Sequence, residues 1–141
     1  MRFIDSNVFL HAFLMPRRSL RSEEQKIKNE AKLIIRDVEG GEEVATTTAH
    51  LSEIVNVVED GLGLHKALSL LAWMISNENI KVYTVSAEDY EKAIPVAREK
   101  NVSANDALAY ICMKTNGIKE IYSFDKHFDQ LKDITRLPKT V

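Results

Sequence analysis

The chain contains 141 residues, of which 45% are hydrophobic and 28% are charged, and its formal net charge is −2 with a pI near 6.1. This length predicts one domain over residues 1–141, large enough to bury a core without disulfides. The mild negative charge excludes a protein that grips nucleic acid through bulk positive charge. The single cysteine, Cys112, excludes an internal disulfide and indicates a cytoplasmic protein, and we expect no membrane partner.

The first half of the chain is expected to alternate strands with helices. In chain order we predict a strand over 1–4, helices over 7–14 and 22–38, a strand over 44–47, and helices over 48–59 and 64–75. Pro16 breaks the first helix, and Ser22 is the expected N-cap of the second. Gly40 and Gly41 mark the end of that second helix.

The second half continues the alternation. In chain order we predict a strand over 80–85, a helix from Ser86, a helix over 103–115, a strand over 120–123, a helical turn over 126–131 and a strand over 134–137. Ser86 and Ser103 each stand three residues before an aspartate, the S-x-x-D pattern of a helix N-terminus. Pro95 is expected to kink the helix from Ser86 or to end its first half.

Strands that alternate with helices predict an α/β fold, with three layers (α/β/α) around a central, mostly parallel five-stranded sheet. Ligands of such folds bind beyond the carboxyl ends of the strands, at the point where the strand order reverses. The residues that directly follow each strand are therefore the first candidates for a functional site.

Four acidic residues fall near such positions. Asp5 directly follows the first strand, and Asp125 follows the fourth. Asp106 lies in the first turn of the helix before the fourth strand, and Glu53 in the second turn of the helix after the second strand. Four carboxylates in one cleft cannot all stay ionised unaided, because like charges raise each other's pKa values. A divalent cation removes this conflict, and an all-oxygen ligand set suits Mg²⁺ or Mn²⁺.

Each of these acids also has a purely structural interpretation. Asp5 would N-cap the helix that follows it, and Asp106 would close a capping box with Ser103. Asp125 would start the helical turn after the fourth strand. Glu53 lies almost opposite the apolar stripe of its helix, so periodicity alone places it on a solvated face.

The basic residues offer weaker signals. Arg17, Arg18 and Arg21 form the one dense basic cluster, which would either hold the phosphates of a substrate or belong to an ordinary solvated loop. Lys126 and His127 follow the last of the four acids and are candidates for substrate contacts. No histidine shows the spacing of a metal-ligand set, so we expect none of the four to bind metal: His11, His50, His65 and His127.

Four short motifs together resemble the PIN domain family, which includes VapC-type toxin ribonucleases. They are IDSN with Asp5, AHLSEIVNVV with Glu53, SANDALAYICMK with Asp106, and SFDKHF with Ser123, Asp125 and Phe128. The pair Leu137-Pro138, after the final short strand, also fits the family. Each motif is weak alone, but the four in this order span the whole chain and are fairly specific.

The resemblance implies a metal-dependent ribonuclease that leaves a 5′-phosphate and a 3′-hydroxyl. Asp5, Asp106 and Asp125 would be the main ligands of Mg²⁺ or Mn²⁺, directly or through water. Glu53 would be a further ligand or would orient the attacking water. The side chains that hold these carboxylates in place would be Ser6, Asn7 and Ser123.

The resemblance also implies partners. If the chain is a toxin, we expect an RNA substrate, a partner antitoxin that lies over the cleft, and a homodimer formed through the helices. The apolar run LSLLAWMI (68–75) is a candidate for the dimer surface, since Trp and Met favour interfaces. The alternative is a helix that is buried in the core of its own chain.

Two other functions stay open on the sequence. A haloacid-dehalogenase-like phosphatase also begins with a strand that ends in Asp, but it requires a second Asp where this chain has Asn7. A PIN-like scaffold that binds RNA or a protein without cutting would share the predicted fold. The presence of all four acids argues against such a scaffold.

Overall fold

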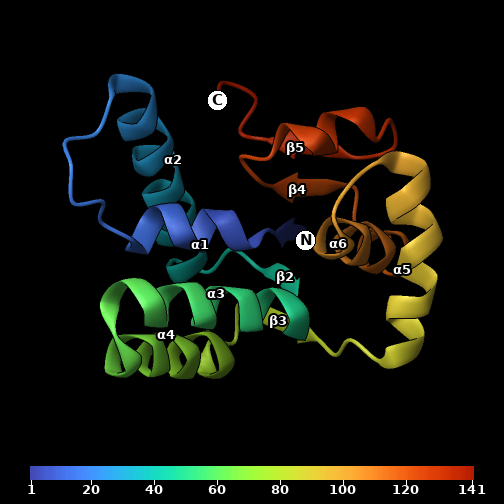
Figure 1. The fold of residues 1–141 in the computed structure, drawn as a ribbon, viewed down its shortest axis with the longest axis horizontal. Helices are drawn as coiled ribbons and strands as arrows, with labels where there is room; N and C mark the ends of the chain where they lie inside the picture. Colours follow the sequence, from blue (N-terminus) through green and yellow to red (C-terminus); the bar gives the residue numbers. More distant parts are fainter.

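The computed structural model covers residues 1–141 and confirms the α/β class (Figure 1). Five strands form one sheet in the order β3-β2-β1-β4-β5, and all neighbouring strands run parallel. The sheet is thus fully parallel, where the sequence predicted a mostly parallel one. The strands are β1 Arg2–Ile4, β2 Val44–Thr47, β3 Ile80–Tyr83, β4 Glu120–Tyr122 and β5 Thr135–Leu137.

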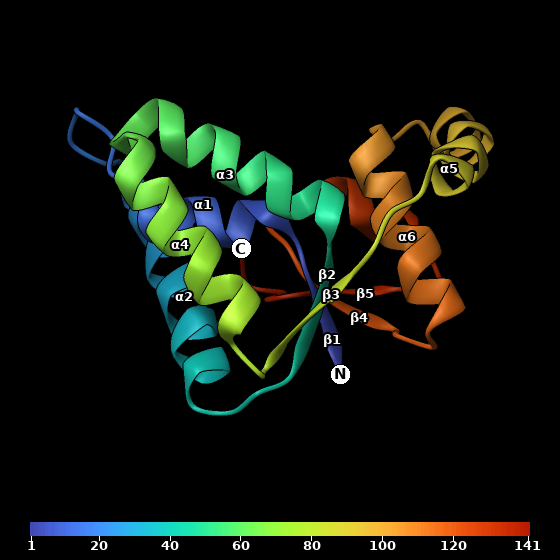
Figure 2. The ribbon, with the colours of Figure 1, turned by 90° about the horizontal axis from the view of Figure 1, so that it is seen from below.

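Helices cover both faces of this sheet. Figure 2 shows α1 to α4 on one side of the strands and α5 and α6 on the other. None of the helices combines the length and the apolar composition that a membrane span requires. Their bounds are α1 Ser6–Phe13, α2 Ser22–Glu39, α3 Thr48–Leu62, α4 Leu64–Ser76, α5 Ala87–Lys100, α6 Ala104–Thr115 and the 3₁₀ helix η1 Lys126–Gln130.

Alternate residues of the central strands face opposite layers and build two separate cores. Ile4 packs in the core that includes Phe9 of α1 and the inner faces of α2, α3 and α4. Its neighbour Phe3 packs in the other core, with Met113 of α6 and Phe128 of η1. Because successive strand residues point to opposite faces, β1 anchors both helical layers. This arrangement confirms the three-layer α/β/α architecture.

The strand order reverses between β1 and β4. From β1 the chain moves outward to β2 and β3, and it returns to β4 on the other side of β1 before it reaches β5. The register pairs Ile4 with Tyr122, so the residues that follow them, Asp5 and Ser123, leave the two strands side by side. The carboxyl ends of β1 and β4 are therefore the position at which such a fold binds its ligand.

Several predicted boundaries differ from the structure by one to three residues; α3, for example, continues to Leu62 rather than ending at residue 59. Helix α2 includes Ser22, but its N-cap is Arg21, because the Glu24 carboxylate accepts the backbone N–H of Arg21 at 3.1 Å. Strand β3 ends at Tyr83, two residues before its predicted end.

Pro95 was predicted either to kink α5 or to end its first half, and the structure excludes the second alternative. The helix continues through this residue to Lys100, with Pro95 exposed to solvent. Ala93, two residues before Pro95, is buried against Ala107 and Leu108 of α6. This packing holds α5 together across the turn in which proline removes a backbone donor.

The apolar run 68–75 lies in α4 and divides between two environments. Leu70 and Met74 are buried in the core, whereas Leu68 and Ile75 are 48% and 63% exposed. The predicted burial within its own chain is therefore correct for one face of α4, whereas the opposite face is exposed to solvent.

Cys112 of α6 is half-buried, and burial raises the pKa of its thiol to about 11, as expected for an unreactive structural cysteine.

A buried lysine secures the end of α1. Lys28 of α2 is 5% exposed, and its ammonium group donates to the backbone carbonyl groups of His11 at 3.0 Å and Leu14 at 2.7 Å. Carbonyl groups at a helix C-terminus lack partners within the helix and carry a partial negative charge. Lys28 thus supplies hydrogen bonds to carbonyl groups at the C-terminus of α1, and Asp5 caps the N-terminus of the same helix.

We predict that Lys28→Met lowers the free energy of unfolding by about 1–3 kcal/mol, because it leaves these carbonyl groups without their charged donor. Urea denaturation at neutral pH measures the change. Lys32→Met, at an exposed position of the same helix, is the matched control and is expected to shift the value by less than about 0.5 kcal/mol. Equal effects of the two substitutions would contradict the capping role.

Candidate active site

Asp5 joins β1 to the start of α1 and also reaches the loop after β4. Its side chain is almost fully buried, with the residue 6% exposed. Oδ1 accepts the backbone N–H of Ser6 at 2.8 Å, and Oδ2 accepts the hydroxyl of Ser123 at 2.7 Å. The predicted N-capping role of Asp5 is therefore confirmed, and the same residue also lies at the point where the strand order reverses.

Ser123 is the link between these two loops. Besides donating to Asp5, its hydroxyl oxygen accepts the backbone N–H of Asp125 at 3.0 Å and the Asn7 side-chain amide at 3.4 Å. The Asn7 carbonyl oxygen accepts the backbone N–H of Phe124 at 3.3 Å. Ser6 ties the same region to α3, because its hydroxyl donates to the His50 carbonyl at 3.3 Å. The three polar residues predicted to hold the acids thus form the contacts between β1, β4 and α3.

Asp106 lies in the first turn of α6 but does not close the predicted capping box. Ser103 accepts the backbone N–H of Asp106 at 3.0 Å, yet no hydrogen bond within 3.5 Å returns from Ser103 to the Asp106 carboxylate. The equivalent pattern in α5 does close, since Asp89 accepts the backbone N–H of Ser86 at 2.8 Å. The Asp106 side chain is 9% exposed and its carboxylate faces Asp125 and His127.

His127 lies beside two of the acids, although the sequence spacing of the histidines predicted no metal ligand among them. Its Nδ1 lies 3.1 Å from Asp125 Oδ1 and 4.0 Å from Asp106 Oδ2. Asp106, Asp125 and His127 can each offer one ligand atom, all within 4.8 Å of one another. Sequence spacing misses this group because Asp106 comes from a different element. Asp125 also caps η1, as predicted, by accepting the His127 backbone N–H at 2.9 Å.

Glu53 is half-buried rather than solvated, so the interpretation from helical periodicity was wrong. The side-chain amide of Asn105, at the start of α6, lies 3.5 Å from Glu53 Oε1. Helix α6 shields Glu53 from solvent, and the sequence pattern of α3 alone contains no information about a neighbouring helix.

The acidic group has no lysine or arginine to balance its charge. None lies within 4.0 Å of the carboxylates of Asp5, Glu53, Asp106 and Asp125. Burial, with the charges of Asp106 and Glu53, raises the pKa of Asp5 to about 7 against the opposing hydrogen bonds. Burial and the charge of Asp125 raise the pKa of Asp106 to about 6.

The nearby imidazole of His50 does not supply the missing charge. Burial lowers the pKa of His50 to about 4, so the ring is neutral at pH 7. Its Nδ1 lies 2.7 Å from the Thr47 hydroxyl, and its Nε2 has no hydrogen-bond partner and lies 3.9 Å from Asp5 Oδ1. The surroundings of Asp5 thus hold several carboxylates and no permanent cation.

The predicted basic cluster is largely paired within its own loop. Arg18 binds the Glu24 carboxylate through two contacts of 2.8 and 2.6 Å, and Arg21 contacts the same carboxylate at 3.1 Å. These contacts favour the solvated-loop interpretation for both residues. Arg17 is exposed in the same loop, and Lys126 is exposed beside Asp125.

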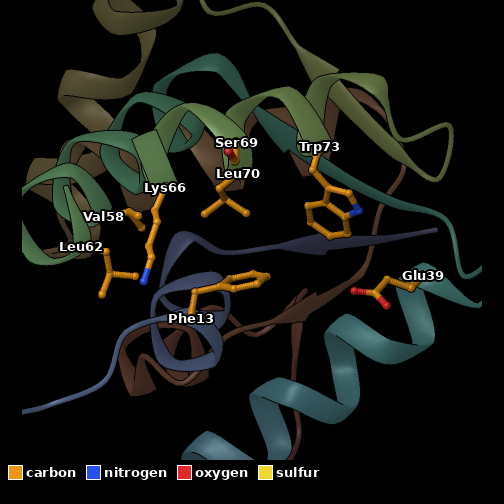
Figure 3. A pocket seen from close by; sticks show the side chains of 8 residues that line it. All are labelled: Phe13, Glu39, Val58, Leu62, Lys66, Ser69, Leu70 and Trp73. Atoms are coloured by element: carbon orange, nitrogen blue, oxygen red, sulfur yellow. The ribbon is translucent and has the colours of Figure 1, made fainter. Parts of the chain in front are cut away.

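A separate apolar hollow of about 470 Å³ lies between α1, α2, α3 and α4 (Figure 3). Phe13 and Trp73 face this hollow, with Lys66 at its edge. None of the residues that line it belongs to the acidic group. The chemistry suggested by the acids therefore resides at the strand switch, away from this hollow.

Solved structures with a similar fold include three from toxin–antitoxin systems. VapC20 of Mycobacterium tuberculosis, described as a toxin that cleaves the sarcin–ricin loop, has a TM-score of 0.71 and 19% identity, over 94% of this chain and 95% of that one. A toxin–antitoxin complex from Klebsiella pneumoniae has a TM-score of 0.64 and 12% identity, with 96% of each chain covered. VapBC2 from Rickettsia felis, bound to a fragment of its promoter DNA, has a TM-score of 0.60 and 14% identity, again over 96% of each.

Comparison of the sequence with curated proteins gave no significant match. The family model described as PIN domain, however, matches residues 2–134, which is nearly the whole chain. This match removes the haloacid-dehalogenase-like alternative and agrees with the motifs around Asp5, Glu53, Asp106 and Asp125. The chain belongs to the PIN domain family.

Proposed function

We propose that this protein is a VapC-type toxin, a metal-dependent ribonuclease that hydrolyses RNA phosphodiester bonds. The observation that carries the proposal is that Asp106 and Asp125, from separate elements, offer ligand atoms within 4.8 Å, while the charges of Asp106 and Glu53 act on the buried Asp5 and no lysine or arginine lies within 4.0 Å. Membership of the PIN domain family supports a nuclease. The folds of the three toxin-system structures support the VapC type.

The donor set fits a hard divalent cation. Asp5, Asp106 and Asp125 would hold Mg²⁺ or Mn²⁺, directly or through water, with Glu53 as a further ligand or as the group that orients the attacking water. These ions prefer carboxylate oxygens and keep several waters. When bound, such a cation lowers the pKa of water and offsets the charge on the attacking and leaving oxygens of a phosphodiester.

The surrounding residues would hold the acids in position. The Ser123 hydroxyl fixes one oxygen of Asp5, and the backbone of Ser6 fixes the other. Asn7 holds the β4 loop through its contacts with Ser123 and Phe124, and so sets the position of Asp125. Carboxylates that are oriented before the substrate arrives require little rearrangement at the reacting phosphate.

We assign substrate contacts to Arg17 and Lys126, which are exposed and have no carboxylate within salt-bridge distance. Arg18 and Arg21 would contribute less, because Glu24 offsets their charge. The protein as a whole is acidic, so the cation would supply most of the positive potential at the scissile phosphate.

We also assign an antitoxin partner and the cytoplasm as the site of action. Two of the similar structures are toxin–antitoxin complexes, which supports such a partner here. A homodimer formed through the helices remains part of the proposal, and the exposed Leu68 and Ile75 of α4 offer apolar surface for it.

The first prediction concerns cleavage. Asp106→Asn is expected to reduce the cleavage of labelled RNA by at least about 100-fold, since losing a ligand removes about 3 kcal/mol or more of transition-state stabilisation. EDTA is expected to abolish the wild-type activity. Asp89→Asn is the matched control, because it changes the same S-x-x-D pattern where Asp89 only caps α5. Equal cleavage by wild type and Asp106→Asn would identify a contaminant, and no cleavage by wild type would favour the non-cutting scaffold.

The second prediction concerns binding without substrate. A ligand that binds only the folded state stabilises it, so saturating Mn²⁺ or Mg²⁺ is expected to raise the melting temperature of the wild type by several degrees. Asp5→Asn is expected to lose most of this gain, and Asp60→Asn, at an exposed position of α3, to keep it. Differential scanning fluorimetry measures the shift. A gain of the same size in Asp5→Asn would show that the cation binds elsewhere.

The third prediction concerns pH in the metal-free protein. The pKa of Asp5 is about 7 in the fold, against 3.8 for an ordinary aspartate, so the folded state binds this proton more tightly. The resulting stability is fully present below about pH 4 and is lost as the pH rises through 7. Between pH 4 and 8, wild type is expected to lose at least about 1 kcal/mol more unfolding free energy than Asp5→Asn. Urea denaturation at each pH measures this, and parallel curves would contradict the raised pKa.

A further inference from the structure

The geometry points to His127 as a metal ligand that, with Asp106 and Asp125, forms a mixed nitrogen and oxygen site favouring transition-metal ions over Mg²⁺. This inference rests on the proposed function of the same site and specifies which cations the site prefers. It departs from the all-oxygen ligand set that the sequence alone suggested.

The separation of the ligand atoms suits a single ion. His127 Nδ1 lies 3.1 Å from Asp125 Oδ1 and 4.0 Å from Asp106 Oδ2, and each residue offers an atom within 4.8 Å of the others. Two atoms that bind one ion at about 2.1 Å are roughly 3.0 Å apart when they subtend a right angle and about 4.2 Å apart when they are opposite. Both histidine distances fall within this range, and the remaining pair, Asp106 and Asp125, lies within 4.8 Å, so a water on the ion would complete the link to the more distant acid.

The Asp106 carboxylate provides an independent reason to place a cation here. Its side chain is 9% exposed, and His127 is the one basic side chain within 4.0 Å of it. The carboxylate accepts no hydrogen bond within 3.5 Å like the one that closes the capping box of Asp89 in α5. A buried carboxylate without a permanent cation is costly, and a cation shared with His127 and Asp125 would remove that cost.

His127 is placed so that its ring can reach this ligand. Its backbone N–H is fixed by Asp125 Oδ1, which keeps the residue beside the acids, whereas its side chain is 59% exposed and is not packed in the core. The ring nitrogen therefore faces the group without being committed to a structural contact in the interior.

An imidazole ligand changes which ions bind. Mg²⁺ selects oxygen donors, whereas imidazole suits transition metals, and affinities rise from Mn²⁺ to Co²⁺ and beyond for a given nitrogen-containing site. A site with one nitrogen ligand is therefore expected to bind Co²⁺ more tightly than Mg²⁺. Removing the imidazole ring of His127 should lower this Co²⁺/Mg²⁺ affinity ratio.

The test compares metal-free wild type, His127→Ala and His65→Ala by calorimetric titration with CoCl₂ and with MgCl₂. His65 is an exposed histidine of α4 and is the matched control. His127→Ala is expected to weaken Co²⁺ binding about tenfold or more and Mg²⁺ binding by less than about threefold, so that the Co²⁺/Mg²⁺ affinity ratio falls. His65→Ala is expected to leave the ratio unchanged.

A second readout follows the ligand itself. In the Co²⁺-loaded wild type, the imidazole N–H proton of a bound histidine is expected to give a strongly shifted NMR signal that His127→Ala removes and His65→Ala retains. An unchanged affinity ratio, or a shifted signal that persists in His127→Ala, would overturn the inference. If Asp106→Asn still abolished RNA cleavage in that case, the proposed nuclease function would stand without His127. If His127→Ala lowers the Co²⁺/Mg²⁺ affinity ratio but the wild type cuts no RNA, His127 is a metal ligand and the proposed nuclease function is wrong.

Discussion

Electrostatic crowding at the carboxyl ends of β1 and β4 is the constraint on which the rest of this structure depends. Asp5 and Asp106 are almost fully buried beside further carboxylates, and no lysine or arginine approaches within 4.0 Å. Burial and the neighbouring carboxylates raise the pKa values of these two acids to about 7 and about 6, so keeping them ionised in the metal-free fold costs free energy. Two hydrophobic cores and the Ser123 hydrogen bonds offset that cost and keep the acids together.

The fold follows closely from local sequence patterns. The alternation of β-branched runs with amphipathic helices predicts the order of elements, and β1 shows why a parallel sheet results, because Phe3 and Ile4 are both fully buried on opposite faces. The same topology directs the search for a site to the strand switch, where Asp5 directly follows β1 and Asp125 lies three residues beyond the end of β4. The inferences about the fold succeed because each depends on residues that are neighbours in the chain or on a general rule of sheet topology.

The details that the sequence could not supply all depend on contacts between distant elements. The motifs SAED and SAND look alike, yet Asp89 closes its capping box and Asp106 does not, because Asp106 faces Asp125 and His127 instead. Helical periodicity places Glu53 on a solvated face, whereas Asn105 of α6 covers it in the structure. Only the resemblance to PIN domains selected Glu53 from the sequence, since no periodicity within α3 distinguishes it.

The register between β1 and β4 determines whether Asp5 and Ser123 can meet. Ile4 pairs with Tyr122, so Asp5 meets Ser123 only when the two strands are in native alignment. Sliding either strand by a single residue would turn its side chains to the opposite face and separate the carboxylate from the hydroxyl that orients it. A mispaired molecule would therefore lack the oriented Asp5 carboxylate, and the acidic site at the strand switch would be complete only after the central strands had paired correctly.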